Sequence, residues 1–464
     1  MRRALAAGAA LWLAGCTVGP NYKRPAVPVP DQYRGQQAPA DVPSIAETKW
    51  PELFQDETLR QLIATALAQN FDVRIAASRV EQARAQWRIQ RADQYPFLAA
   101  QAGYTAQRQS SVGSFRFIQP GTDLSASYTT AGAALSWDLD LFGRLRRLSE
   151  AARARYLATE EARHGVTVAL IGDVSDAYFL LRERDLELQI ARQTRDIAQD
   201  SLRLVQLRHQ RGAATGLDEH QAEQLLYTAT AQIASAERDI ARTEDSLRLL
   251  AGEAPGDVPR GKALEEFKTA PDVPAGLPSA LVERRPDIRE AEQNLVAANA
   301  QIGAARALYF PNISLTGFLG GQSRALGSLF NGPARDQSIG PAALLPIFNA
   351  GQIRSTVRLS VEQQRELLLT YQRTIYNALR EVSDALTTYQ RTNQQLAEQE
   401  KLVHALSEST RLSTLRYKGG LDNYLQVLDA ERNLFTGQLA LAQLRLQVLN
   451  SYVQLYRALG GGWQ

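Results

Sequence analysis

Two long segments of the chain carry apolar side chains at alternating spacings of four and three residues. In the first, between about Leu145 and His209, the series is Leu170, Val174, Ala177, Leu181, Leu188, Ala191, Ala198, Leu202 and Val205. In the second it is Ala378, Val382, Ala385, Tyr389, Leu396, Val403 and Leu406. Heptad spacing of this kind predicts helices that pack as coiled coils. The first segment contains no proline, so its roughly 65 residues predict one helix of about 98 Å.

In other segments the pattern alternates between apolar and polar or small residues, which is typical of strands. The two segments in the first half are Phe97–Gln107 and Thr129–Leu141, and those in the second half begin at Asn312 and near Ile339. Strands of about ten alternating residues fit a membrane, although an exposed soluble hairpin gives the same pattern. After the first residues no apolar run reaches about 18, so a membrane-spanning role would need strands in a closed barrel.

The two halves of the chain resemble each other. A shift of 215 positions places Leu62 on Leu277, and further along a shift of 208 places Val174 on Val382. Each unit reads as helix, strand pair, very long helix, tip and returning helix, and such a repeated unit rarely buries its face alone. The predicted ranges are repeat 1 at 56–252 with strands about 96–141, a linker at 253–278, and repeat 2 at 279–460 with strands about 311–348.

Helix ends follow from proline and glycine. One first helix is expected from Asp56 to about Asp93, where Tyr95-Pro96 stops it. The long helices are expected to close at Gly212 and at Gly419-Gly420 in left-handed conformations. Returning helices are then predicted over Leu217–Leu250 and Leu421–Leu459.

The N-terminal residues read as a targeting signal. Residues 1–15 combine a basic start with a short apolar run, and Leu13-Ala14-Gly15-Cys16 looks like the lipobox of bacterial lipoproteins, in which Cys16 is acylated. The alternative is an ordinary signal peptide with a chance cysteine. Thr17 after Cys16 favours the outer membrane, and residues 16–55 are expected to form an acylated tether. Cys16 is the only cysteine, so no disulfide or cysteine metal site is expected.

With a net charge of +3 and interspersed acids and bases, the chain has no character of a nucleic-acid surface. The histidines His164, His209, His220 and His404 are scattered, and no phosphate-cradling or nucleophile motif is present. We therefore expect no enzyme activity, no cofactor and no metal site.

In this arrangement the chain resembles the TolC-like outer-membrane efflux channels, in particular the lipoprotein branch that serves resistance-nodulation-division pumps. The resemblance covers nearly the whole chain. Its specific parts are Leu13 to Cys16, Val18 to Tyr22 with Pro25, Trp50 to Asp56, Trp137 with Asp140 to Gly143, and Leu415 to Gly420 through Leu428 to Arg432.

The resemblance implies a mainly α fold with a membrane β-barrel: a homotrimer in which four strands per chain form a twelve-stranded barrel in outer-membrane lipid, while the helices form a coiled-coil barrel through the periplasm. It implies passive export of drugs or other small molecules, with a periplasmic adaptor protein and an inner-membrane resistance-nodulation-division transporter as partners. The alternatives are a type I secretion exit duct for proteins, and a purely structural envelope coiled coil, which leaves the alternating strands unexplained.

The family's gate at the helix tips corresponds here to Tyr417, Leu425, Asp429 and Arg432. Three copies of Asp429 around a narrow axis would form a ring that attracts cations. The alternative is a pair of solvated charges at i, i+3. In the first repeat the matching positions are Gln221 and Gln224, so the charges are not needed for the repeated fold. The tips expected to contact the adaptor carry Arg208, Gly212, Arg416, Gly419 and Gly420.

Overall fold

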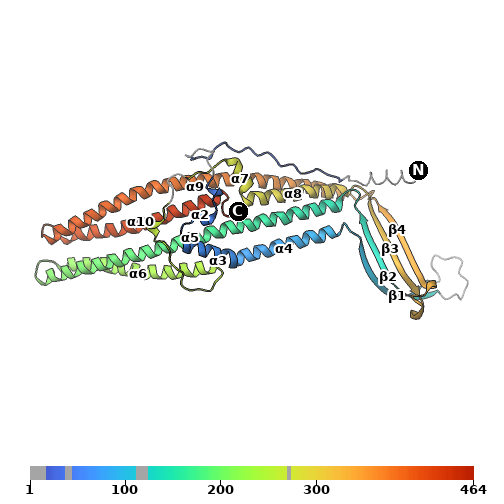
Figure 1. The fold of residues 1–464 in the computed structure, drawn as a ribbon, viewed down its shortest axis with the longest axis horizontal. Coiled ribbons are helices and arrows are strands. Elements are labelled where there is room, and N and C mark those ends of the chain that lie inside the picture. The colour runs from blue at the N-terminus through green and yellow to red at the C-terminus, as the bar shows by residue number, and fades with distance from the viewer. Residues whose placement is uncertain (1–16, 37–43, 111–123, 269–272, 464) are drawn as a thin grey trace. The chain divides into compact units, whose positions relative to one another are not determined.

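The computed structural model describes residues 17–36, 44–110, 124–268 and 273–463 (Figure 1). In the first half the elements are α2 (Trp50–Leu53), α3 (Glu57–Gln69), α4 (Phe71–Ala92), β1 (Phe97–Arg108), β2 (Ser125–Leu139), α5 (Arg144–Gln210) and α6 (Gly216–Leu250). In the second half they are α7 (Pro278–Arg284), α8 (Pro286–Ala307), β3 (Asn312–Ser323), β4 (Arg335–Leu344), α9 (Gln352–Lys418) and α10 (Tyr424–Ala458). Short 3₁₀ turns complete the described chain.

The chain divides into two compact units. The sheet unit holds the described residues up to Pro25 together with Val80–Thr159 and Ala291–Tyr371. The hairpin unit holds Ala26–Arg79, Glu160–Glu290 and Gln372–Gln464. Within the described residues, no helix is both long enough and apolar enough to cross a membrane.

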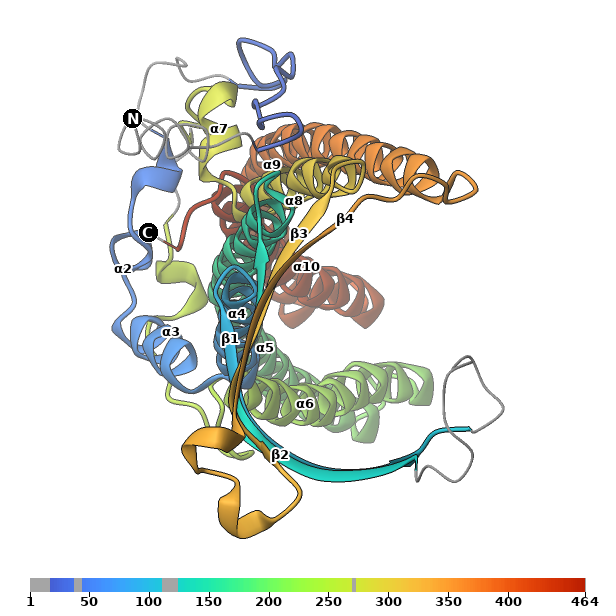
Figure 2. The ribbon, with the colours of Figure 1, turned by 90° about the vertical axis from the view of Figure 1, so that its right-hand side faces the viewer.

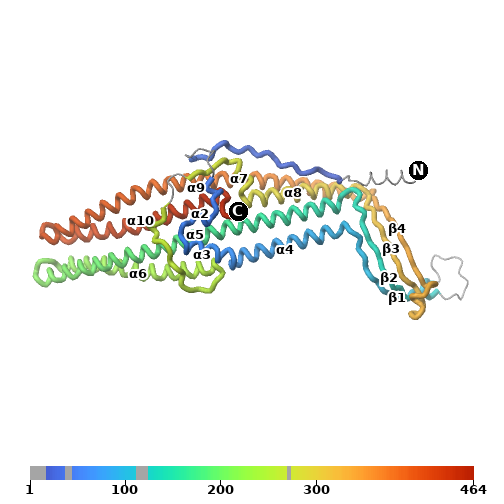
Figure 3. Tube along the Cα trace, in the orientation of Figure 1, coloured from blue at the N-terminus to red at the C-terminus, as the bar shows by residue number. Residues whose placement is uncertain are grey.

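The two halves have the same order of elements, and four of the matching pairs are equal in length. Helices α5 and α9 each contain 67 residues, and α6 and α10 each contain 35. Helices α4 and α8 each contain 22 residues, and strands β1 and β3 each contain 12. Figure 3 traces the chain back on itself twice, from α5 into α6 and from α9 into α10. We call these the first and the second hairpin.

In the sheet unit, the four strands form one antiparallel sheet in the order β1-β2-β3-β4 (Figure 1). Strands β2 and β3 join the two halves, with Ala133 opposite Leu319. Figure 2 shows that the sheet is curved, most visibly along β2. Strands β1 and β4 are its edges, and Leu98 and Tyr104 of β1 and Ile339 of β4 are each at least 70 % exposed.

Two glycines face each other where β2 pairs with β3. Gly132 lies opposite Gly320 in the register. A Cβ atom on Gly132 would come within 2.5 Å of the Leu319 carbonyl oxygen and 2.7 Å of the Gly320 Cα atom. Real Cβ atoms do not approach this closely, so the close contact of the two strands requires glycine here.

The structure corrects the predicted helix from Asp56 to Asp93, which is broken at Asn70 into α3 and α4. Asn70 is buried, and its Oδ1 atom accepts hydrogen bonds from the amides of Asp72 at 2.8 Å and Val73 at 3.1 Å. Its Nδ2 atom donates to the Leu250 carbonyl at 2.9 Å. The side chain therefore starts α4 as an N-cap and fastens the break to the end of α6.

Two further boundaries differ from expectation. The last strand was expected around Ile339–Phe348, but β4 covers Arg335–Leu344. Pro346 cannot continue the ladder, and Pro341 is tolerated because β4 is an edge strand. The last helix starts at Tyr424 rather than Leu421, because the Asn423 side chain caps it by accepting from the Gln426 amide at 3.4 Å.

The segment expected as a linker is packed into the hairpin unit. Val258 and Leu264 are buried in the same apolar cluster as Leu59 of α3 and Tyr178 of α5. The Asp56 carboxylate accepts hydrogen bonds from the Tyr178 hydroxyl at 3.0 Å and from the Lys262 amide at 2.8 Å. Asp56 thus joins the start of α3, the middle of α5 and the connecting segment.

In the sheet unit, the residues that follow the predicted lipidation site are fixed by hydrogen bonds and by close packing. The Val18 amide donates to the Phe142 carbonyl at 3.1 Å, and Arg147 donates to Asn21 Oδ1 at 2.8 Å. Arg24 donates twice to the Glu292 carboxylate, at 2.7 Å for each nitrogen. A Cβ atom on Gly19 would lie 2.4 Å from the Gly303 Cα atom, so the segment lies directly against α8.

Candidate functional site: the hairpin tips

The two hairpin tips close in the same way. Gly212 has φ +75° and Gly420 has φ +74°, the left-handed conformations expected from the sequence. The amide of Ala213 donates to the Arg208 carbonyl at 2.8 Å, and the amide of Leu421 donates to the Arg416 carbonyl at 2.9 Å. These bonds satisfy carbonyls that the ends of α5 and α9 would otherwise leave open. The predicted glycine closures are therefore confirmed.

Arg208 of the first hairpin lies on the end of the second. Its guanidinium carbon is 4.2 Å from the centroid of the Tyr417 ring. Its Nη2 atom donates to the Tyr417 carbonyl at 3.1 Å and to the Lys418 carbonyl at 3.4 Å. A cation at these last carbonyls of α9 is favoured by the helix dipole as well as by the ring. Arg208 therefore fastens the two tips of one chain to each other.

Arg416 is also engaged within the chain. Its Nε atom donates to Asp422 Oδ2 at 2.6 Å, and its Nη2 atom donates to Asp422 Oδ1 at 3.1 Å. The bidentate pair closes the turn between α9 and α10 and lowers the pKa of Asp422. Sequence analysis did not identify Asp422, although its position six residues after an arginine, beyond two glycines, is a signal for such a turn.

The remaining gate candidates lie on the first turns of α10. Leu425, Asp429 and Arg432 are exposed, whereas Tyr417 at the end of α9 is buried and its ring lies 5.6 Å from that of Tyr424. Asp429 Oδ2 accepts a hydrogen bond from Asn433 Nδ2 at 3.1 Å. Among the described residues of this single chain, the structure gives Arg432 no ion pair with Asp429. Both charges are thus presented at the surface of the tip.

A groove beneath the tips contains residues that sequence analysis missed. It has a volume of about 820 Å³ and is bounded by α5, α9 and α10, with Ser201, Tyr417 and Glu431 in its lining. Glu431 is only 5 % exposed. Nothing in the sequence indicated its burial, because that burial depends on contacts with α5 that the local sequence does not reveal.

The tips of the first hairpin also carry histidine–carboxylate pairs. Nδ1 of His209 lies 2.8 Å from Glu219 Oε2, and Nδ1 of His220 lies 2.9 Å from Glu223 Oε2. The pKa of His220 is raised by its hydrogen bond to Glu223. In the part of the chain that the structure describes, no three histidine or acidic side chains gather in a way that would hold a metal ion.

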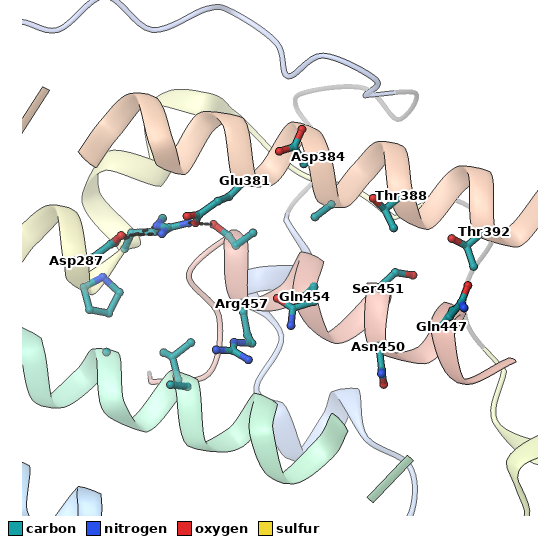
Figure 4. Close-up of a pocket in the computed structure, with 17 residues that line it drawn as sticks. Asp287, Glu381, Asp384, Thr388, Thr392, Gln447, Asn450, Ser451, Gln454 and Arg457 are labelled. Atoms are coloured by element: carbon teal, nitrogen blue, oxygen red, sulfur yellow. Dashed lines mark hydrogen bonds and ion pairs between the residues drawn. The ribbon is translucent and has the colours of Figure 1, made fainter. Parts of the chain in front are cut away.

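A second groove of about 820 Å³ lies in the middle of the hairpin unit (Figure 4). Thr388 and Thr392 of α9 lie across from Asn450, Ser451 and Gln454 of α10. At one end, Arg285 is paired with Asp287 at 2.7 Å and with Glu381 at 2.8 Å. The lining mixes polar with apolar side chains, and its second arginine, Arg457, is paired with Asp173 at 3.1 Å. None of the predicted site residues lies in it.

The predicted lipidation residue Cys16 and the signal at 1–15 lie outside the described residues. The described part of the tether begins at Thr17, beside Gly143.

Comparison with known proteins places this chain among outer-membrane efflux proteins. The family model described as "Outer membrane efflux protein" matches residues 62–253 and 277–461. The chain is 41 % identical over 461 residues to the solvent efflux pump outer membrane protein SrpC of Pseudomonas putida, covering 98 % of this chain and 97 % of that protein.

Solved structures agree. A membrane protein from Pseudomonas aeruginosa superimposes with a TM-score of 0.89 at 37 % identity, covering 97 % of this chain and 98 % of that one. The open state of the Neisseria gonorrhoeae MtrE outer membrane channel gives a TM-score of 0.87 at 32 % identity, covering 97 % and 99 %. The chain therefore belongs to the outer membrane efflux protein family and is an outer-membrane channel of an efflux pump that extends into the periplasm.

Proposed function

We propose that three copies of this chain form one duct, and the open sheet is the observation that carries this proposal. Strands β1 and β4 are both edges, and their apolar side chains are exposed in the single chain. An edge strand with unpaired backbone groups and exposed apolar side chains readily pairs with a strand of another chain. Because β1 to β4 alternate in direction, β4 of one copy can pair antiparallel with β1 of the next without a change of pattern. Three copies then give a closed twelve-stranded barrel in outer-membrane lipid.

The duplicated helical hairpins would continue this barrel as a coiled-coil tube. The duct conducts passively, since the energy for export comes from a partner pump. The exported compounds are drugs or other small molecules; the relative SrpC is named for solvent efflux. Family membership removes the purely structural coiled coil as an alternative. It also favours small-molecule efflux over a protein secretion duct, because the relative is an efflux pump component.

The gate of this duct lies at the hairpin tips. Asp429 and Arg432 are exposed there, so three copies can bring them to the axis and to one another across chains. Leu425 is exposed on the same helix as an apolar constriction, while buried Tyr417 supports the tip beneath Arg208. That MtrE is described in an open state supports two states for channels of this fold.

The tips also dock a periplasmic adaptor, which links the duct to an inner-membrane resistance-nodulation-division transporter. Leu217 and Leu421 are 66 % and 71 % exposed beside Gly212, Gly419 and Gly420 and offer apolar contacts. Arg208 and Arg416 are engaged within the chain, so their role in docking is to shape the tips. Acylation of Cys16 would add a lipid anchor to the barrel.

The proposal is tested by purifying the mature protein in detergent and measuring its mass, then inserting it into planar bilayers. A trimer that produces single-channel steps is expected. A test variant carries both Ile339→Asp and Leu98→Asp. It should insert into bilayers less often than wild type, because both side chains would face outward at the sheet edges. A stable monomer without channel activity would contradict the proposed duct.

A further inference from the structure

Glu431 of α10 is a buried carboxyl that connects the two hairpins. The hydroxyl of Ser201, on α5 of the first hairpin, donates to Glu431 Oε1 at 3.1 Å. The second oxygen, Oε2, is buried and has no hydrogen-bond partner in the described chain. A carboxylate with an unpartnered oxygen is costly to bury, whereas a protonated carboxyl is much less so.

The charged groups around this carboxyl do not neutralise it. Those that share the groove are Asp200 and Arg203 of α5, Arg411 and Lys418 of α9, together with the hydroxyls of Tyr417 and Tyr424; Asp218 of α6 approaches Tyr424. None of the three cations forms an ion pair with Glu431 within the described residues, and Arg411 is paired with Glu408 at 3.0 Å. The side chain therefore sits among apolar and hydroxyl groups.

Burial raises the pKa of Glu431 to about 7, while the hydrogen bond from Ser201 lowers it in part. Any movement that separates α10 from α5 would break this hydrogen bond and bring the carboxyl into water. There its pKa would return toward the usual value of about 4.3.

We propose that Glu431 is a proton-dependent latch: in its neutral form it keeps α10 against α5 and the tips closed, and loss of its proton releases them. This inference rests on the proposed gate at the tips. It adds periplasmic pH as a regulator of that gate.

The sign follows from linkage. The packed arrangement holds the proton more tightly than the separated one, so raising the pH favours separation. Between the separated-state pKa of about 4.3 and the packed-state pKa of about 7, the ratio of separated to packed tips rises by up to about tenfold for each pH unit. Above about pH 7 the carboxyl is ionised in both arrangements and the ratio levels off, and below about pH 4.3 it is protonated in both and closure is insensitive to pH.

The matching position in the first repeat, Glu223, is not a second latch. It is only partly buried and is paired with His220. The device is thus confined to the second hairpin, where the proposed gate charges also lie.

The experiment measures single-channel open probability of the full trimer in planar bilayers at pH 6.0 and pH 8.5. Wild type should open several-fold more at pH 8.5, and Glu431→Gln should stay closed at both values, because glutamine mimics the neutral acid. The control Glu398→Gln changes an exposed glutamate of α9 and should keep the wild-type response. Ser201→Ala, which removes the bond that lowers the pKa, should move the midpoint to higher pH.

An infrared titration reports on the carboxyl without channel activity. The bands of buried protonated carboxyls should lose intensity between pH 6.0 and pH 8.5 in wild type, and the part that belongs to Glu431 is the component missing in Glu431→Gln, because buried Glu183 with its raised pKa contributes in both proteins. A pH response that survives Glu431→Gln, or a carboxyl already ionised at pH 6.0, would overturn the latch. If no protein conducts, the proposed duct fails, and the infrared titration still decides the protonation of Glu431.

Discussion

The guanidinium of Arg208 stacks 4.2 Å from the centroid of the Tyr417 ring while it donates to two terminal carbonyls of α9. We predict that Arg208→Ala loosens the tips, with a loss of about 1–2 kcal/mol of local stability. Hydrogen exchange should accelerate at the amides of residues 415–420. Arg195→Ala removes a half-exposed arginine whose ion pair within the described chain is with Asp196, and it should leave this exchange unchanged.

Gly132 and Gly320 make the close contact between β2 and β3. Gly132→Ala should destabilise the sheet by about 3 kcal/mol, because the new Cβ atom would overlap the backbone of β3. Gly103→Ala is the matched control, since its Cβ atom would meet only Thr130 Oγ1 at 3.6 Å. Thermal unfolding of the two variants distinguishes them. Equal melting temperatures would show that the strands can move apart freely.

Asn70 holds the break between α3 and α4 with three hydrogen bonds. Asn70→Ala should cost about 2 kcal/mol, because a cap is lost and the Leu250 carbonyl loses a donor. Asn70→Asp should retain the cap but not the bond to Leu250, so its free energy of unfolding should lie between those of wild type and Asn70→Ala. Denaturant unfolding measures the order, and an alanine variant as stable as wild type would contradict it.

Glu183 of α5 is 1 % exposed, and burial together with the neighbouring Glu187 raises its pKa to about 8. Its folded pKa lies above the unfolded value, so the folded state binds the proton more tightly. The stability from this group is present below about pH 4.3 and is lost as pH rises through 8. Between pH 6 and 9, the melting temperature of Glu183→Gln should therefore fall less than that of wild type.

The large elements could be predicted because their signals are local. The absence of proline and the heptad stripe predicted a helix from about Leu145 to His209, and α5 covers Arg144–Gln210. Gly212 and Gly420 marked the tips for the same reason. The helix break at Asn70 was missed because the helical spacing of apolar residues continues across it, so a break of one residue leaves no mark in the pattern.

The electrostatic details of the site could not be predicted in this way. The burial of Glu431 depends on α5, whose Ser201 is its hydrogen-bond partner and lies 230 positions away in the sequence. The hydrogen bonds from Arg208 to the terminal carbonyls of α9 likewise form only when both hairpins are folded next to each other. Such long-range contacts decide the charge state and freedom of a side chain, and a single sequence does not contain them.

The most direct test of the proposed gated duct compares single-channel conductance of wild type with that of the double variant Asp429→Ala and Arg432→Ala. The matched control is Gln221→Ala with Gln224→Ala, at the corresponding positions of the first repeat. We expect small, cation-selective openings in wild type and in the control, and larger, less selective openings in the double variant. Identical conductance in all three proteins would contradict a gate at these residues.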